Sequence, residues 1–262
     1  MPTTVYPLAY DECGAGLPVV LLHGFPHDRT LWSPQLGAFV DVCRCIAPDL
    51  RGFGDSLVAP PYTIDSYADD VVALLDKLGI EQAVIGGLSM GGYIAFAIWR
   101  RHKRRVRALV LADTRAGVDS DATRSARRAQ IDLVRSRGAA VLAAQLVPGQ
   151  LGARTRERHP DIAEVVRDMI ARAPVEGIVG ALEAMLGRPD STPTLATIDV
   201  PTLVIVGEED GLTPPAESRT IHDGITGSLL ETIVGAGHLS SIERPAAFNH
   251  VLSEFVGRLR YA

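Results

Sequence analysis

The sequence predicts an α/β fold in which a mostly parallel sheet carries helices on both faces. Short apolar segments recur along the chain, each bounded by Gly, Pro or Asp, at 18–24, 43–48, 82–87, 106–113, 201–210 and 229–238. They are continuous runs of Val, Ile and Leu, which is typical of strands buried on both faces of a parallel sheet. Segments with helical periodicity separate most of them, and this alternation predicts parallel strands joined by helical crossovers.

Two of the intervening segments show clear helical signals. The segment 66–80 opens with Ser66 as a candidate N-cap and closes on Gly79. The segment 90–102 carries its basic residues in the last turn, where they complement the helix dipole. Both segments follow predicted strands, as a doubly wound α/β topology requires.

The alternation of strands and helices stops at about 115–195. Arg-rich amphipathic segments follow one another there without a strand-like run, and the α/β pattern resumes at Pro201. We therefore predict a core domain formed by residues 1–114 and 196–262, with a helical cap inserted at 115–195. The cap arginines are expected to face solvent, with contacts to an acidic substrate as the alternative.

Length, composition and charge exclude several classes of protein. The chain has 262 residues, of which 47% are hydrophobic and 22% charged, and this suits one globular domain with a modest insertion. Its formal net charge of -5 gives no reason to expect nucleic acid or an anionic membrane surface as a partner. The first residues do not look like a signal peptide, and no run of roughly 18 apolar residues could span a bilayer. We expect a cytoplasmic protein.

One serine stands between a predicted strand and a predicted helix. Ser89 is the central residue of the sequence GLSMG at 87–91, a G-x-S-x-G pattern. A sharp strand-to-helix turn needs small neighbours, because their Cβ atoms would collide with the adjacent strand and helix. Such a turn exposes the hydroxyl at the carboxyl end of the sheet, beside the N–H groups that start the helix. A phosphate-binding loop is excluded, since neither a G-x-G-x-x-G nor a Walker pattern fits.

A serine nucleophile needs a base that is held by a carboxylate. Of the seven histidines, only His238 lies in a glycine-flanked loop directly after a late strand, whereas the context of His27 predicts the surface. Asp210 ends a predicted strand in a turn rich in Gly and Pro, and we prefer it as the carboxylate. Asp113, which closes an earlier predicted strand, is the alternative.

The remaining predicted site residues surround this group. Gly24 follows a predicted strand and would let the backbone swing, so that the N–H groups of Phe25 and Met90 form an oxyanion hole. We expect Trp32 and Leu239, together with Phe25, to line an apolar pocket, with core packing as the alternative.

On these residues the sequence resembles the α/β-hydrolase superfamily over nearly the full chain. The resemblance rests on HGFP at 23, PDLRGFGDS at 48, GLSMGG at 87, GEEDGLTPP at 207 and GAGHLSSIERP at 235. The chain order Ser89, Asp210, His238 is also that of the superfamily. The resemblance implies an eight-stranded, mostly parallel sheet, a cap over its carboxyl ends and a serine hydrolase mechanism. Haloalkane dehalogenases and epoxide hydrolases have Asp where this chain has Ser89, so acyl chemistry is favoured.

Within the superfamily, the sequence looks most like small carboxylesterases. It is also similar to 3-oxoadipate enol-lactonases, through LADTRAG at 111 and EEDGLTPP at 208. We expect an enzyme that cleaves small or medium carboxylic esters through an acyl-enzyme, with lactone hydrolysis as the first alternative. A ligand-binding receptor that has kept the fold is the alternative of a different class. The expected mechanism needs no metal or organic cofactor, and the spacing of the three cysteines matches no zinc or redox motif.

Overall fold

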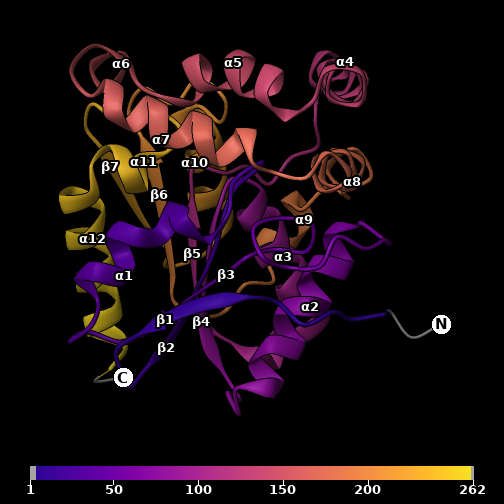
Figure 1. The fold of residues 1–262 in the computed structure, drawn as a ribbon. Coiled ribbons are helices and arrows are strands. Elements are labelled where there is room, and N and C mark those ends of the chain that lie inside the picture. Colours follow the sequence, from indigo (N-terminus) through magenta and orange to yellow (C-terminus); the bar gives the residue numbers. More distant parts are fainter. Residues whose placement is uncertain (1–3, 261–262) are drawn as a thin grey trace.

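A single seven-stranded sheet organises residues 4–260, the part of the chain that the computed structural model describes (Figure 1). The strand order is β1-β3-β2-β4-β5-β6-β7, with β1 antiparallel to β3 and all other pairs parallel. The strands are β1 (Tyr10–Cys13), β2 (Pro18–Leu22), β3 (Arg44–Pro48), β4 (Ala83–Leu88), β5 (Val106–Ala112), β6 (Thr202–Gly207) and β7 (Leu229–Ile233). The mostly parallel sheet is therefore confirmed.

The expected number of eight strands is wrong for the described residues, which form seven. All six predicted apolar segments contain a strand. The seventh strand, β1, was not predicted, because it is a short edge strand with polar, partly exposed residues. Before β1, two backbone N–H groups donate to side chains and not to a neighbouring strand. The N–H of Tyr6 donates to Asp70 and that of Ala9 donates to Ser56. Pro7, between them, has no N–H to donate.

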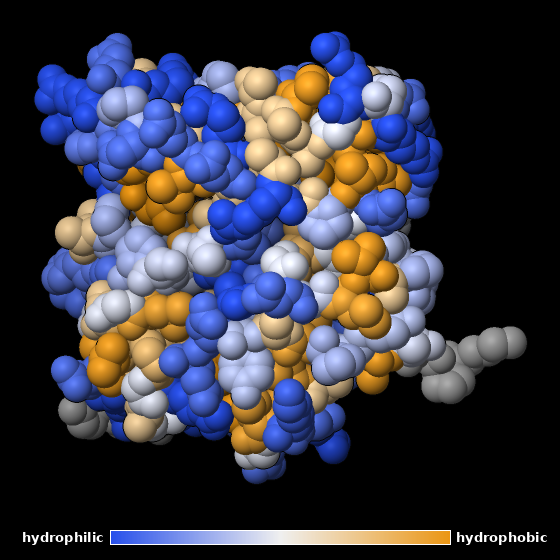
Figure 2. Space-filling model, in the orientation of Figure 1, coloured by the Kyte–Doolittle hydropathy of each residue, from blue (hydrophilic) through white to orange (hydrophobic). Residues whose placement is uncertain are grey.

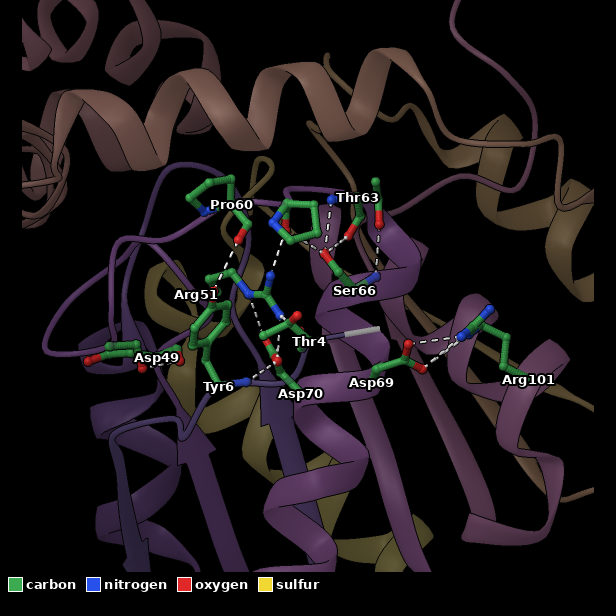
Figure 3. A network of polar contacts seen from close by, with 12 residues as sticks. Thr4, Tyr6, Asp49, Arg51, Pro60, Thr63, Ser66, Asp69, Asp70 and Arg101 are labelled. Atoms are coloured by element: carbon green, nitrogen blue, oxygen red, sulfur yellow. Dashed lines mark hydrogen bonds and ion pairs between the residues drawn. The ribbon is translucent and has the colours of Figure 1, made fainter. Parts of the chain in front are cut away.

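A buried ion pair fixes this first segment to the body of the protein (Figure 3). Arg51 donates to both carboxylate oxygens of Asp70, at 2.7 Å from Nε and 2.6 Å from Nη2. Its other contacts are the carbonyl oxygens of Pro61, at 2.6 Å, and Thr4, at 3.1 Å. The side chains of Arg51 and Asp70 are essentially inaccessible to solvent, so each charge depends on the other for compensation.

Alternate side chains of the parallel strands enter two apolar cores, one on each face of the sheet. In β2, for example, Val20 and Leu22 join one core, whereas Val19 and Leu21 join the other. Helices α2 (Ile64–Lys77) and α3 (Met90–His102) cover the first face. The second face carries α1 (Ser33–Ala38) and α12 (Pro245–Leu259) (Figure 1).

The two helices that were predicted from periodicity are present. Helix α3 has the predicted bounds, and α2 begins slightly earlier than expected because Thr63, not Ser66, is its N-cap. Ser66 occupies the third helical position and completes a capping box with Thr63. The other elements outside the segment between β5 and β6 are η1 (Arg29–Trp32), η2 (Lys103–Arg105), α10 (Pro215–Gly224) and α11 (Ser240–Glu243).

The chain between β5 and β6 is helical, as predicted. It forms α4 (Asp121–Arg137), α5 (Ala139–Gln150), α6 (Ala153–Arg158), α7 (Pro160–Ala171), α8 (Val175–Leu186) and α9 (Thr192–Leu195). Figure 1 shows α4–α8 gathered beyond one end of the sheet. Hydrophilic residues cover the outer corners of this region, near α4 and α6, in Figure 2. We call α4–α8 the helical segment.

Candidate active site

Ser89 stands alone between the end of β4 and the start of α3. Its φ of 54° lies in the left-handed region that non-glycine residues seldom adopt, so the turn holds backbone strain. Two hydrogen bonds brace it: its N–H donates to the Ala112 carbonyl, and its carbonyl accepts from the Thr114 hydroxyl. A Cβ on Gly87 would overlap the backbone of Gly91, so glycine is required for strand and helix to meet here.

The structure brings Ser89, His238 and Asp210 together from three separate elements. His238 Nε2 lies 2.9 Å from Ser89 Oγ, and His238 Nδ1 lies 2.9 Å from Asp210 Oδ2. Asp210 follows β6 and His238 follows β7, at the carboxyl edge of the sheet where Ser89 follows β4. When Nδ1–H donates to the carboxylate, Nε2 is left to accept the Ser89 proton.

The turn after β6 holds the Asp210 carboxylate in place. Oδ1 accepts the N–H groups of Leu212, at 2.8 Å, and Thr213, at 2.9 Å, while the Thr213 hydroxyl donates to Oδ2. Burial raises the pKa of Asp210, but the charge and hydrogen bond of His238 and the bonds from Thr213 outweigh it, so the net pKa is lowered. Burial likewise lowers the pKa of His238, but the charge and hydrogen bond of Asp210 raise it further, so the net shift is upward.

Asp113, the alternative acid, has other partners. One of its oxygens accepts the N–H of Gly207 at 2.8 Å, and the other accepts the hydroxyl of Ser240. The side chain is fully buried. Burial, and then the nearby negative charge of Asp210, raise the pKa of Asp113 to about 8. His238 is thus hydrogen-bonded to Asp210 and not to Asp113, and the raised pKa of Asp113 favours its protonated form at neutral pH.

Phe25 and Met90, the predicted oxyanion donors, both lie close to Ser89: Phe25 lines the same pocket and Met90 follows Ser89 in the chain. Met90 begins α3, so its N–H belongs to the first turn and has no acceptor within the helix. Gly24 packs against Ser89, because a Cβ on Gly24 would lie 3.3 Å from Ser89 Cβ. His23 stabilises this loop: Nδ1 lies 2.8 Å from the Gly24 carbonyl, and Nε2 accepts the N–H of Leu50 at 2.9 Å.

The prediction that His27 lies at the surface is wrong, because this residue is 1% exposed. Burial, followed by the proximity of His23, lowers the pKa of His27 to about 3, so this imidazole is neutral. Its Nε2 lies 3.3 Å from Gln150 Oε1. Gln150, which the sequence did not single out, ends α5, donates its amide to the Phe25 carbonyl and accepts the backbone N–H of His238 at 2.9 Å.

A pocket of about 340 Å³ opens beside Ser89 and His238. Phe25, from the loop after β2, lines this pocket, and the helical segment contributes residues such as Leu146. The prediction that Trp32 and Leu239 line this pocket is wrong. Both are buried in the core on the α12 face, where the Trp32 ring lies 6.0 Å from the Phe248 ring, so packing was the correct alternative.

Within residues 4–260, no group of three or more His, Cys, Asp or Glu is arranged to hold a metal ion. No helix in this part of the chain is both long and apolar enough to cross a bilayer. Cys43 and Cys45 are buried as free thiols, as small apolar residues would be.

Comparisons with known proteins bear on this arrangement. The model of the "alpha/beta hydrolase fold" family matches residues 18–245. 3-Oxoadipate enol-lactonase 2 of Acinetobacter baylyi is 33% identical over 230 residues, which make up 87% of this chain and 84% of that protein.

Two solved structures are closely similar to this one. A thermophilic esterase from Thermogutta terrifontis, with malate bound, has a TM-score of 0.94 and 41% identity, covering 96% of this chain and 93% of that one. The enol-lactonase from Burkholderia xenovorans LB400 has a TM-score of 0.88 and 32% identity, covering 95% and 96%.

Proposed function

The chain belongs to the α/β-hydrolase fold family, and from this premise we propose that it is a serine hydrolase that cleaves carboxylic esters of small or medium acyl or aryl groups. The observation that carries the proposal is the continuous relay from Ser89 Oγ through His238 to Asp210, with both contacts at 2.9 Å. The similarity to an esterase of 41% identity supports the reaction class.

The first half of the mechanism forms an acyl-enzyme. His238 Nε2 takes the proton from Ser89 Oγ as the oxygen attacks the ester carbonyl carbon. The negative charge that develops on the carbonyl oxygen is stabilised by the N–H groups of Phe25 and Met90. His238 then gives its proton to the leaving alcohol oxygen as the bond to the acyl carbon breaks.

The second half releases the acid. His238 removes a proton from water as the water oxygen attacks the acyl carbon, and Ser89 leaves with the proton that His238 returns. Throughout, Asp210 keeps Nδ1 of His238 protonated and stabilises the imidazolium that forms in each step. Every proton is therefore transferred between His238, Ser89, water and substrate.

We propose that the insertion at 115–195 acts as a cap on a core formed by 1–114 and 196–262. The mixed lining of the pocket supports this division, because residues of α4, α5 and α8 line it together with Ser89. The residues that select the substrate would then lie on the cap and those that react with it on the core.

Labelling and turnover together test the proposed function. A fluorophosphonate should label the wild type and not Ser89→Ala, while Ser125→Ala, which alters an exposed serine of α4, should be labelled normally. Ser89→Ala should also lose about 10⁴-fold to 10⁶-fold in hydrolysis of a short p-nitrophenyl ester while its circular dichroism is unchanged. Substantial turnover by a folded Ser89→Ala would refute the assignment.

Lactone hydrolysis is the second candidate, because two curated relatives, at 33% and 29% identity, are 3-oxoadipate enol-lactonases. The same relay would open a ring ester, with the alcohol remaining attached to the acyl group. A panel of acyl esters, aryl esters, lactones and enol-lactones separates the two. Turnover of enol-lactones with negligible turnover of simple esters would replace the leading proposal.

A receptor that has kept the fold is the candidate of a different class. It predicts that no substrate of the panel is turned over repeatedly, even if Ser89 reacts with the fluorophosphonate. The intact relay and the braced turn at Ser89 support catalysis instead.

A further inference from the structure

The pocket beside Ser89 has a positively charged wall in a negatively charged protein. Its lining includes Arg115 and Arg127, whereas no Asp or Glu of the described chain is part of the lining. The whole sequence carries a formal net charge of -5. A pocket with one sign of charge concentrates ligands of the opposite sign.

Arg127, on α4, has hydrogen-bonding capacity left over. Its Nε lies 2.6 Å from Asp119 Oδ2 and its Nη2 lies 3.4 Å from Oδ1. Its third nitrogen, Nη1, has one hydrogen-bond partner within residues 4–260, the thioether sulfur of Met185 at 3.2 Å. Sulfur is a weak acceptor, so an oxygen anion in the pocket would be a much better partner for this N–H group.

A second arginine shares the same counter-ion. Arg188 Nη2 lies 3.0 Å from Asp119 Oδ1, so one carboxylate faces two guanidinium groups. The Arg188 side chain is 3% exposed, and within residues 4–260 its Nε and Nη1 have no hydrogen-bond acceptor. Asp119 thus pairs directly with two guanidinium groups, and Asp190 adds only a more distant negative charge near Arg188, so an anion beside Arg127 would complete the pairing of these largely buried charges.

Tyr93 lies between this cluster and the pocket that contains Ser89, because it contacts Arg188 and also lines the pocket. It lines the pocket from α3, the helix that starts beside Ser89, and the Arg188 guanidinium lies 4.2 Å from the centre of its ring. Apolar residues of the wall, such as Leu146 and Met185, lie in the same pocket. An anionic group near Arg127 and an ester at Ser89 could thus be joined by a hydrocarbon chain within one cavity.

We propose that Arg127 forms a carboxylate-binding subsite, so that the ester or lactone cleaved at Ser89 carries a second, free carboxylate. The inference rests on the proposed function and specifies its substrate class. Among the described residues, Arg127 offers one N–H group, at Nη1, without an oxygen partner, and a carboxylate with one negative charge suits it better than a phosphate monoester, which carries about two negative charges at neutral pH. Arg115 adds a second positive charge to the wall, although Glu217, at 3.9 Å, partly offsets it.

The test compares charged and neutral esters of equal chain length. Mono-p-nitrophenyl esters of succinic, glutaric and adipic acid are measured against p-nitrophenyl butyrate, pentanoate and hexanoate. For the chain length that spans the pocket, we expect kcat/KM of the charged ester to exceed that of its neutral partner by at least about tenfold, the effect of one hydrogen bond to a charged group. Ratios near or below one at every length, with neutral esters still hydrolysed, would refute the subsite and leave the proposed function standing.

Two substitutions on α4 locate the effect. Arg127→Gln should bring the charged-to-neutral ratio down to about one, whereas Arg128→Gln, which removes an exposed charge one residue away, should retain the wild-type ratio. An equal fall in the ratio for both variants would show a general charge effect and refute the role of Arg127. If Arg127→Gln does not fold, Arg127→Lys, which keeps the charge and loses the fork, should lower the ratio instead.

Binding to the folded Ser89→Ala variant tests the subsite without turnover. Calorimetry should show glutarate binding that competes with the charged ester and is lost in Ser89→Ala/Arg127→Gln. If no ester is hydrolysed and no fluorophosphonate reacts, the proposed function fails, while glutarate binding still decides the subsite. Binding of inorganic phosphate in preference to glutarate, or binding of neither, would overturn the carboxylate assignment.

Discussion

Replacing Asp113 with Asn should stabilise the protein at neutral and alkaline pH, although Asp113 is fully buried and hydrogen-bonded. With its pKa raised to about 8, the carboxyl group is protonated in the folded protein at pH 7. In this protonated form it accepts the N–H of Gly207, and its own O–H donates to Ser240 Oγ once the Ser240 hydroxyl, which donates to the ionised form, has rotated away. Asparagine has the same shape and offers the same acceptor and donor, so Asp113→Asn should keep both contacts.

The size of the effect follows from the two pKa values of this group. The ordinary pKa of this group is 3.8 and its pKa in the folded protein is about 8. Between pH 3.8 and pH 8, the unfolded chain therefore releases the proton while the folded protein retains it. Because the folded pKa is raised, stability is full below the unfolded pKa and is lost as pH rises, at about 1.4 kcal/mol per pH unit. The loss in the wild type reaches about 4 kcal/mol at pH 7, and Asp113→Asn has no such loss.

Urea unfolding of the wild type and Asp113→Asn at a series of pH values measures this difference. Between pH 5 and pH 8, the stability advantage of the variant should widen by about 4 kcal/mol, with unchanged m-values. Ester turnover should fall far less than in Asp210→Asn, because His238 bonds to Asp210. A variant that is less stable than the wild type at pH 8, with the same pH dependence, would show that Asp113 is ionised in the folded protein and refute the reasoning.

Three further predictions concern other parts of the molecule. Because His238 must be neutral to act as base and its pKa is raised, kcat/KM should fall as pH drops through an inflection above about 6.5. Gln150→Ala, which frees the loop at Phe25, should lower kcat about tenfold, whereas Gln145→Ala, on the exposed face of α5, should not. Arg51→Met should cost about 3–5 kcal/mol in urea unfolding by leaving Asp70 buried and unpaired, and a second change, Asp70→Leu, should restore much of it.

The sequence could predict the positions of Ser89, Asp210 and His238 because each is marked by the strand before it. The carboxyl ends of parallel strands meet at one edge, so an apolar run followed by a polar residue in a Gly-rich turn locates that residue without any knowledge of packing. The choice of Asp210 over Asp113 also agrees with the observed hydrogen bond to His238. The edge strand β1 lacked such a mark, because an exposed four-residue strand has no continuous apolar run.

Side-chain direction was harder to predict than backbone position. Trp32 and Leu239 lie next to segments that reach the site, yet both side chains pack into the core, because the motifs fix the path of the chain and not the face that each residue presents. His27 shows the opposite error. Its polar sequence neighbours predicted a surface position, but in the structure it is buried beside Gln150. Long-range contacts of this kind, 123 residues apart in the chain, leave no local pattern.

Side-chain direction was also hard to predict for the arginines of the helical segment, where it decides which of them can contact a ligand in the pocket. Arg127 and Arg128 are adjacent and chemically identical, and helical geometry turns them about 100° apart. One lines the pocket with its N–H groups partly unused, and the other is exposed. Helix α4 therefore carries both a solvent-facing arginine and one that lines the pocket, and contact with a substrate stays a prediction.

Gln150 indicates that the helical segment contributes to more than the shape of the pocket. Its side chain bonds to the Phe25 carbonyl, next to one proposed oxyanion donor, and its backbone carbonyl accepts the N–H of His238, the proposed base. A displacement of the end of α5 would therefore disturb two groups that act in the transition state. If the segment opens to admit substrate, closing it also restores the positions of Phe25 and His238, which couples substrate capture to the assembly of the catalytic group.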